Sequence, residues 1–335
     1  MKRITSNFDT MSTLQTGPVS PTEMASRLPV KLTGLVAATF TPLTSEGELD
    51  LSVIGPYVDY LTKRQGVRNI FVNGTTGEGM SLSVEERKRT AEEWCLRARG
   101  KMDNVIVHVG CLSIKDSKDL AHHAETVGAD GIGVISPSFF KPKTADALRS
   151  YLKEVASAAP TLPFYYYHIP ALTGSNLLAS DVCKGLGALI PTFSGVKFSG
   201  TDLMDFGQCV RHGQADQALL YGVDEQLLAA LAFGANGAVG SLYNYLGSHF
   251  NKLLMAFAQG DLVGARALQF SVQDLLAFAS KYGFDVALNK QLMSDLSGLS
   301  LGPPRLPLVP CRPEMAAAVA QKYHQIFPEP GELLE

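Results

Sequence analysis

The chain has 335 residues, of which 46% are hydrophobic and 18% charged, and its formal net charge at pH 7 is −3. Such a composition supports a sizeable core and excludes a chain that is disordered overall. It provides no basic field for nucleic acid or for an anionic membrane, so we expect a small-molecule partner and neither of those. No apolar run approaches the length of a membrane span.

Cysteine usage and the first residues bear on the compartment. Five cysteines are scattered and never spaced CxxC, which indicates free thiols in a reducing compartment and predicts a cytoplasmic location. Residues 1–30 are rich in Ser, Thr and Pro and lack an apolar signal-peptide core, so we expect a flexible N-terminal tail. Basic residues leave a transit peptide open, and Asp9 and Glu23 count against it.

From residue 31 onward, short apolar runs alternate with longer stretches of helical period, which is typical of βα units around a parallel sheet. Strands are predicted at 34–40, 69–73, 104–110, 131–136, 163–168, 195–199, 218–222 and 237–242. Helices are predicted at 51–63, 84–99, 115–127, 145–158, 178–186, 203–211, 225–233 and 248–258. Eight units over residues 31–260 predict an α/β fold, the (β/α)8 TIM barrel.

An open, doubly wound sheet is the main alternative to the barrel. It would normally carry a glycine-rich phosphate turn after an early strand, and neither GxGxxG nor GxxxxGK[ST] occurs. After the eighth unit, residues 261–300 keep a helical period without a further strand, residues 302–307 break it, and a last helix is predicted at 314–325. Residues 261–335 are therefore predicted to form a C-terminal helical extension packed on the barrel.

Lys197 is the most informative charged residue, because it lies in the apolar run of residues 193–199 between two turn signals. Burying an ammonium group without a partner is unfavourable, so a lysine in such a strand tends to lose its proton and become an amine nucleophile. We therefore consider a Schiff-base lysine. The alternative is a lysine at the end of its strand that extends to solvent.

In a barrel, chemistry takes place at the carboxyl ends of the strands, so the residues there are the remaining candidates. Thr75 and Thr76 follow strand two in a glycine-flanked turn suited to a carboxylate or phosphate, although a plain turn fits the same letters. One tyrosine of the run at 165–167 is placed to transfer a proton. Ser199 shares a strand face with Lys197.

Strands seven and eight add the remaining polar candidates. Gly222, Asp224 and Glu225 follow strand seven, where a helix-capping carboxylate is the alternative interpretation, and Ser241 follows a glycine-rich strand eight. The histidines show no metal-ligand spacing, so no metal site is predicted. The charged residues at 84–88 are interpreted as surface pairs.

Several of these segments together resemble one known family in order and spacing. The runs GTTGEG, YYYHIPALTG, GVKFS and GVDE followed by GAVGSLYN are similar to the dihydrodipicolinate synthase and N-acetylneuraminate lyase family of pyruvate-dependent class I aldolases, over about residues 31–310. The resemblance implies a (β/α)8 barrel with a C-terminal helical extension, a cytosolic homotetramer, and neither metal nor organic cofactor. Longer runs, including NIFVNGTTGEG, are most similar to the animal members that cleave N-acetylneuraminate reversibly to N-acetylmannosamine and pyruvate.

The resemblance also implies a role for each matching residue. Lys197 would form the Schiff base, Tyr167 would transfer the proton, and Thr75 with Thr76 would hold the carboxylate of the keto acid. The residues expected to face the polyol tail of the sugar are Ser199, Gly222, Asp224, Glu225 and Ser241.

Two departures from the family pattern limit what is carried over. Dihydrodipicolinate synthases have an arginine shortly after the strand-five tyrosine, where this chain has Ala171 and Leu172. Many members have a tyrosine after strand four that reaches a neighbouring subunit, where this chain has Phe139 and Phe140, which cannot relay a proton. A pyruvate aldolase for another sugar acid, a dihydrodipicolinate synthase, and a silent barrel that binds sialic acid remain alternatives.

Overall fold

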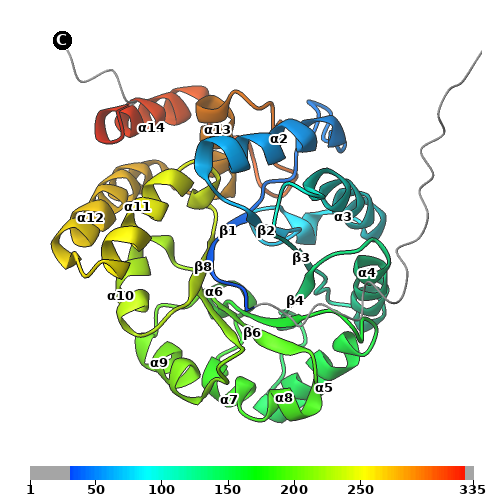
Figure 1. Ribbon diagram of the computed structural model, residues 1–335. Helices are drawn as coiled ribbons and strands as arrows, with labels where there is room; N and C mark the ends of the chain where they lie inside the picture. Colours follow the sequence, from blue (N-terminus) through cyan, green and yellow to red (C-terminus); the bar gives the residue numbers. More distant parts are fainter. Residues whose placement is uncertain (1–30, 329–335) are drawn as a thin grey trace, which may run out of the picture. The chain divides into compact units, whose positions relative to one another are not determined.

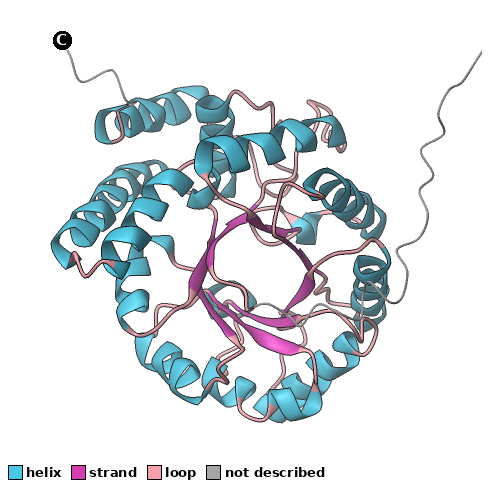
Figure 2. Ribbon diagram, viewed as in Figure 1, coloured by secondary structure: helices cyan, strands magenta, loops and turns pink. Residues whose placement is uncertain are grey.

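The structure, a computed structural model, describes residues 31–328. Eight parallel strands close into a barrel in the order β1-β2-β3-β4-β5-β6-β7-β8. Helices surround this ring of strands on the outside (Figures 1 and 2). The predicted (β/α)8 barrel is confirmed, whereas the tail predicted at residues 1–30 lies outside the described residues.

All eight predicted strands are present, each within three residues of its expected bounds. They are β1 (Gly34–Ala38), β2 (Asn69–Val72), β3 (Asn104–His108), β4 (Gly131–Ile135), β5 (Phe164–His168), β6 (Phe193–Phe198), β7 (Ala218–Tyr221) and β8 (Gly237–Gly240). β6 begins earlier than predicted because its pairing with β5 shifts register beside Gly195. Gly195 has φ +145°, and a Cβ there would collide with the backbone of Ala218, so the strand needs glycine two residues before Lys197.

The helices follow the strands as predicted, with several interruptions. The α-helices are α2 (Ile54–Tyr60), α3 (Val84–Ala98), α4 (Ile114–Thr126), α5 (Ala145–Ala156), α6 (Pro170–Thr173), α7 (Ala179–Cys183), α8 (Leu186–Leu189), α9 (Leu203–His212), α10 (Leu227–Ala232), α11 (Gly247–Ala258), α12 (Leu262–Ala279), α13 (Val286–Ser297) and α14 (Pro313–Ile326). Shorter or non-α turns are η1 (Leu51–Val53), η2 (Leu61–Gln65), η3 (Gly79–Ser81), η4 (Asp224–Gln226), η5 (Leu242–Asn244) and η6 (Ser280–Tyr282).

Local sequence explains where many of these helices begin. Side-chain oxygens accept a backbone N–H in the first turn of six helices, from Ser83, Ser113, Thr144, Asp202, Asp261 and Asp285. The single helix predicted at 178–186 is instead split into α7 and α8, because Gly185 adopts a left-handed conformation with φ +76°. The short α6 was not predicted at all.

The extension contains two helices, α12 and α13, where the sequence showed one continuous helical period. Gly283, with φ +74°, and the N-cap Asp285 separate them. α14 then lies beside both α12 and α13 (Figure 1). The domain boundary at residue 260 stays a prediction; it falls between α11, which ends at Ala258, and α12, which begins at Leu262.

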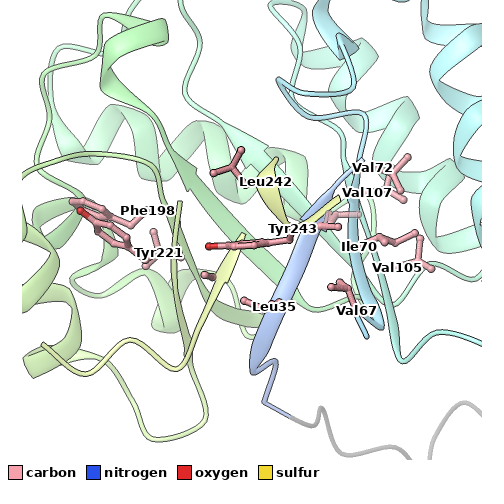
Figure 3. Close-up of a cluster of buried hydrophobic side chains, with 14 of the residues drawn as sticks. Leu35, Val67, Ile70, Val72, Val105, Val107, Phe198, Tyr221, Leu242 and Tyr243 are labelled. Atoms are coloured by element: carbon pink, nitrogen blue, oxygen red, sulfur yellow. The ribbon is translucent and has the colours of Figure 1, made fainter. Parts of the chain in front are cut away.

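Two clusters of apolar side chains lie on the two faces of the strands. The larger cluster fills the layer between strands and helices, and Figure 3 shows part of it. The smaller cluster lies inside the barrel and consists of Leu32, Val36, Ala38, Phe71, Ile106, Tyr165, Tyr167, Ala218, Leu220 and Val239. Tyr165 and Tyr167 therefore point inward while Tyr166 belongs to the outer cluster, as the period of two predicted.

Candidate active site

Lys197 lies inside the barrel next to two aromatic rings. It pairs with Tyr167 of β5 in the strand register, and the residue is only 4% exposed. Its Nζ lies 4.0 Å from the ring centroid of Tyr167 and 4.2 Å from that of Phe71 on β2. Within residues 31–328, no carboxylate lies within ion-pair distance of this amine. The prediction that this lysine is buried rather than extended to solvent is confirmed.

Burial changes the acidity of Lys197. Loss of hydration lowers the pKa of its ammonium group from 10.5, while the Tyr167 phenol and the Asp224 carboxylate act in the opposite direction. The net direction is downward, so a larger fraction of this side chain is the neutral amine near neutral pH. A neutral amine is the form that attacks a carbonyl carbon.

Tyr167 connects the lysine to the loop after β2. Its hydroxyl oxygen and Thr75 Oγ1 are 3.0 Å apart and share a hydrogen bond. The Tyr167 ring also packs edge-on against Phe71, with 5.6 Å between the ring centroids. Thr76 is half-buried next to Thr75. The structure thus brings Lys197, Tyr167 and Thr75 together at the carboxyl end of the strands.

Ser199 and Gly222 lie side by side at the ends of β6 and β7. The backbone N–H of Ser199 donates to the carbonyl of His168 at 2.7 Å, and that of Gly222 donates to the carbonyl of Phe198 at 2.7 Å. These bonds extend the strand ladder by one residue on each strand. The Ser199 side chain occupies the space beside Gly222 where another residue would place its Cβ, so the pair is neighbouring, as predicted from the strand ends.

Asp224 and Glu225 are adjacent in sequence but differ in environment. Asp224 is 6% exposed, and its Oδ2 accepts the Leu242 N–H at 2.9 Å. Its Oδ1 lies where a Cβ on Gly240 would collide with it, and the buried Tyr243 hydroxyl lies within hydrogen-bonding reach of the same carboxylate. Burial raises the pKa of Asp224 to about 6. The Asp224 carboxylate therefore joins the loops after β7 and β8, while Glu225 is half-buried.

Ser241 is half-buried at the end of β8, where its hydroxyl contacts the C-terminal extension. Its Oγ accepts a hydrogen bond from Asn289 Nδ2 of α13 at 2.9 Å. The next residue on that helix, Lys290, donates to Glu78 Oε1 at 2.9 Å, and both side chains are at most 1% exposed. The sequence did not predict a role for Asn289, Lys290 or Glu78.

The signals for the missed residues were of two kinds. Lys290 interrupts a buried apolar face formed by Ala287, Leu288 and Met293, which is the same signal that identified Lys197. Glu78 belongs to the GTTGEG run, but its partner lies 212 residues further along the chain. No local pattern connects residues so far apart.

Arg87 corrects the surface-pair interpretation of residues 84–88. It is 2% exposed and donates to the carbonyls of His108 at 2.6 Å and Gly110 at 2.9 Å. Its helix face is turned toward the barrel, because α3 packs on the β2 and β3 side of the sheet. His108 is the last residue of β3 and is buried. Burial, together with the positive charge of Arg87, lowers the pKa of its imidazole well below 6.5.

The two phenylalanines after β4 and the leucine in α6 are exposed side chains. Phe139 and Phe140 are 74% and 86% exposed after β4, and Leu172 is 60% exposed in α6. The five cysteines are free thiols. In the part of the chain that the structure describes, no three His, Cys, Asp or Glu side chains gather as a metal site would require, and no helix is long and apolar enough to cross a membrane.

A parallel barrel that holds a buried, desolvated lysine at the carboxyl end of its strands, beside a tyrosine hydroxyl, has the arrangement of a class I aldolase, a lyase that works through a lysine Schiff base. Comparison with known proteins is consistent with this class. The sequence profile of the Dihydrodipicolinate synthetase family matches residues 31–326.

Individual relatives are similar over most of the chain. The N-acetylneuraminate lyase of Danio rerio is 60% identical over 295 residues, which is 88% of this chain and 96% of that protein. The N-acetylneuraminate lyase of Homo sapiens is 60% identical over 279 residues, 83% of this chain and 87% of that one. The solved structure of Proteus mirabilis N-acetylneuraminate lyase has a TM-score of 0.84 at 38% identity and covers 89% of this chain and 99% of its own. The chain belongs to the dihydrodipicolinate synthetase family.

Proposed function

We propose that this protein catalyses the reversible aldol cleavage of N-acetylneuraminate to N-acetylmannosamine and pyruvate. One observation carries the proposal: Lys197 is a buried amine that has no carboxylate at ion-pair distance among residues 31–328, next to a tyrosine whose hydroxyl is hydrogen-bonded to Thr75. The relatives that are 56–60% identical to this chain bear the name N-acetylneuraminate lyase. Their name supplies the substrate, and the site supplies groups suited to the chemistry.

The reaction begins with the open-chain keto form of the sugar acid. The neutral amine of Lys197 attacks the C2 carbonyl carbon, the carbinolamine loses water, and an iminium joins C2 to Nζ. The lowered pKa of Lys197 supports this step, because it raises the fraction of amine available for attack. The iminium then accepts electrons from the bond that breaks.

Tyr167 transfers the proton during carbon–carbon cleavage. The Tyr167 phenol gives its proton to the hydroxyl that leaves the carbinolamine as water and becomes a phenolate. This oxygen then takes the proton of the C4 hydroxyl, the C3–C4 bond breaks, and the electron pair of that bond passes to the iminium to form an enamine. N-acetylmannosamine leaves as the aldehyde. The enamine is then protonated at C3, and hydrolysis of the resulting iminium releases pyruvate and restores the amine. Thr75 orients the phenol through the 3.0 Å hydrogen bond.

The remaining residues bind the two ends of the substrate. Thr75 and Thr76 hold the carboxylate, which presents C2 to Lys197 in a reactive orientation. The groups assigned to the polyol tail are Ser199, Gly222, Asp224, Glu225 and Ser241. Among these, Ser199, Gly222, Glu225 and Ser241 are half-buried, which suits direct contact. The Asp224 carboxylate accepts the Leu242 N–H through one oxygen and has the buried Tyr243 hydroxyl as a neighbour.

We also propose the cellular setting. Free thiols fit the cytosol, and the exposed Phe139 and Phe140, whose rings pack edge-on with 5.0 Å between centroids, fit a contact between subunits of a homotetramer. The chemistry drawn above requires no metal or organic cofactor, because the iminium itself accepts the electrons.

A substrate panel tests the proposed function. Purified protein is incubated with N-acetylneuraminate, other 2-keto sugar acids, or the dihydrodipicolinate synthase substrates, and pyruvate release or consumption is measured. We expect the highest kcat/KM for N-acetylneuraminate and none for an aldehyde that carries a carboxylate, because Leu172 offers that group no cation. A higher kcat/KM for another sugar acid would identify that compound as the substrate instead. Sugar binding without turnover would favour a catalytically silent barrel that only binds sialic acid.

A further inference from the structure

Helix α13 of the C-terminal extension directs two adjacent polar side chains at the candidate site. Asn289 is 6% exposed and Lys290 is fully buried. α13 lies next to α14 (Figure 1), yet these two residues form hydrogen bonds with the loop after β2 and with the end of β8. Those two segments carry the residues assigned to opposite ends of the substrate.

Lys290 holds Glu78 in an unusual conformation. Lys290 Nζ donates to Glu78 Oε1 at 2.9 Å and to the carbonyl of Pro303 at 3.0 Å. The other carboxylate oxygen of Glu78 accepts the N–H of Arg305 at 2.6 Å. Glu78 has φ +54°, a left-handed conformation that non-glycine residues keep only where their surroundings enforce it. Here the enforcing groups belong to the extension.

The conformation of Glu78 determines where the two threonines lie. The Glu78 N–H donates back to the carbonyl of Thr75 at 3.0 Å, and the Gly79 N–H donates to the carbonyl of Gly74 at 3.1 Å. Residues 74–79 therefore form one closed turn, anchored at Glu78. Movement of Glu78 would shift Thr75 relative to the Tyr167 hydroxyl, to which it is now hydrogen-bonded at 3.0 Å.

Asn289 acts on Ser241 in a comparable way. Its Nδ2 donates to Ser241 Oγ at 2.9 Å, while its Oδ1 accepts the Tyr245 hydroxyl at 2.9 Å. The tyrosine bond orients the amide, because a carbonyl oxygen accepts and an amino group does not. Ser241 thus accepts from the helix and keeps its own O–H available to donate to another group.

We propose that Lys290 and Asn289 are positioning residues for the two substrate halves: Lys290, through Glu78, positions the Thr75 and Thr76 loop for the keto-acid carboxylate, and Asn289, through Ser241, positions the hydroxyl that binds the sugar. The inference rests on the proposed function. The C-terminal extension is then a part of the active site: Lys290 acts on the keto-acid end of the substrate and Asn289 on the sugar end.

The condensation direction separates the two roles, because pyruvate and N-acetylmannosamine then have separate KM values. We expect Lys290→Met to raise the KM for pyruvate about ten-fold or more and to leave the KM for N-acetylmannosamine nearly unchanged. We expect Asn289→Leu, which keeps side-chain volume and removes the donor, to raise the KM for N-acetylmannosamine several-fold and to leave that for pyruvate nearly unchanged.

Two further variants control for folding. Glu78→Gln combined with Lys290→Met removes both buried charges together, so the protein folds without an unpaired carboxylate, and the raised KM for pyruvate should persist. Leu292→Ala opens a cavity on the same helix, and no hydrogen bond links Leu292 to the site. This variant should lower the thermal midpoint without separating the two KM values.

The proposal is supported if Lys290→Met raises only the KM for pyruvate and Asn289→Leu raises only the KM for N-acetylmannosamine. Equal changes of both KM values in each variant, or a wild-type KM for pyruvate in the double variant, would overturn it while leaving the proposed function intact. A wild-type protein that condenses no pyruvate would instead overturn the proposed function and the inference together.

Discussion

Two buried lysines of this barrel lie in opposite electrostatic settings. Lys290 on α13 has Glu78 at 2.9 Å, and both side chains are at most 1% exposed. Lys197 on β6 is also buried, yet its Nζ faces the rings of Tyr167 and Phe71. Burial lowers the pKa of both ammonium groups. The partner therefore decides the role: a carboxylate keeps Lys290 a structural cation, and the lack of one near Lys197 among residues 31–328 makes that side chain available as an amine.

The comparison also concerns stability. Removing one member of a buried ion pair leaves an uncompensated charge, which is strongly destabilising, whereas removing a buried charge that has no partner relieves a desolvation penalty. The same substitution at the two positions should therefore affect folding and catalysis differently.

Lys197→Met should abolish cleavage. Without the amine no iminium forms, so we expect kcat for pyruvate release to fall by about 10⁴-fold to 10⁶-fold. Lys290→Met is the matched control, since it removes the other buried lysine and keeps the nucleophile. Pyruvate release is measured by a coupled assay at saturating N-acetylneuraminate. Substantial turnover by the Lys197 variant would contradict the assigned role.

Tyr167→Phe should separate Schiff-base formation from bond cleavage. Loss of the phenol removes the proton acceptor, so kcat should fall by about 10²-fold to 10⁴-fold, while trapping of pyruvate on Lys197 continues. Tyr165→Phe, one layer deeper on the same strand face, serves as the control and should have little effect. Parallel loss of trapping and turnover would assign Tyr167 to binding instead.

Lys290→Met should lower the free energy of unfolding by about 3 to 5 kcal/mol, because Glu78 remains buried without its cation. Lys197→Met should leave the free energy of unfolding unchanged or raise it, since no carboxylate loses a partner. Urea unfolding of both variants at one protein concentration provides the measurement. Similar destabilisation by the two substitutions would contradict the claim that only Lys290 stabilises the fold through an ion pair.

Asp224→Asn should change how stability depends on pH. Burial raises the pKa of Asp224 from its ordinary 3.8 to about 6, a difference equivalent to about 3 kcal/mol. Because the folded-state pKa is raised, this contribution to stability is complete below about pH 4 and is lost as the pH rises through about 6.

The asparagine variant keeps an acceptor for the Leu242 N–H and carries no charge at any pH. It should therefore exceed the wild type in free energy of unfolding by up to about 3 kcal/mol at about pH 8, and by much less at about pH 4. Unfolding curves at the two pH values check this. A difference that does not depend on pH would show that Asp224 ionises as an ordinary carboxyl.

The sequence predicted the parts of the fold that depend on local periodicity. Alternating apolar runs located all eight strands, and the period of two placed Tyr167 on the inner face. Lys197 was identified from the sequence because it is a charged residue within a short apolar run. Convergence of the strand ends then brought Thr75 into the prediction, and its bond to Tyr167 agrees with that placement.

Long-range pairing explains what the sequence did not predict. Arg87 was interpreted as a surface residue, yet it is buried against β3 because α3 packs there. Glu78 and Lys290 are 212 residues apart, and the packing of the C-terminal extension on the barrel brings them together. Asp224 is bound to the loop after β8 rather than to its own helix, which a local capping rule does not reveal.

Borohydride trapping tests the central claim most directly. The full-length protein is incubated with pyruvate, reduced with borohydride and digested, and the peptides are mapped by mass. Lys290 is paired with Glu78, whereas no carboxylate in the described part of the chain lies at ion-pair distance from Lys197, so we expect a reduced pyruvate adduct on the peptide that contains Lys197. An adduct on the Lys290 peptide, on another peptide, or on none would contradict it.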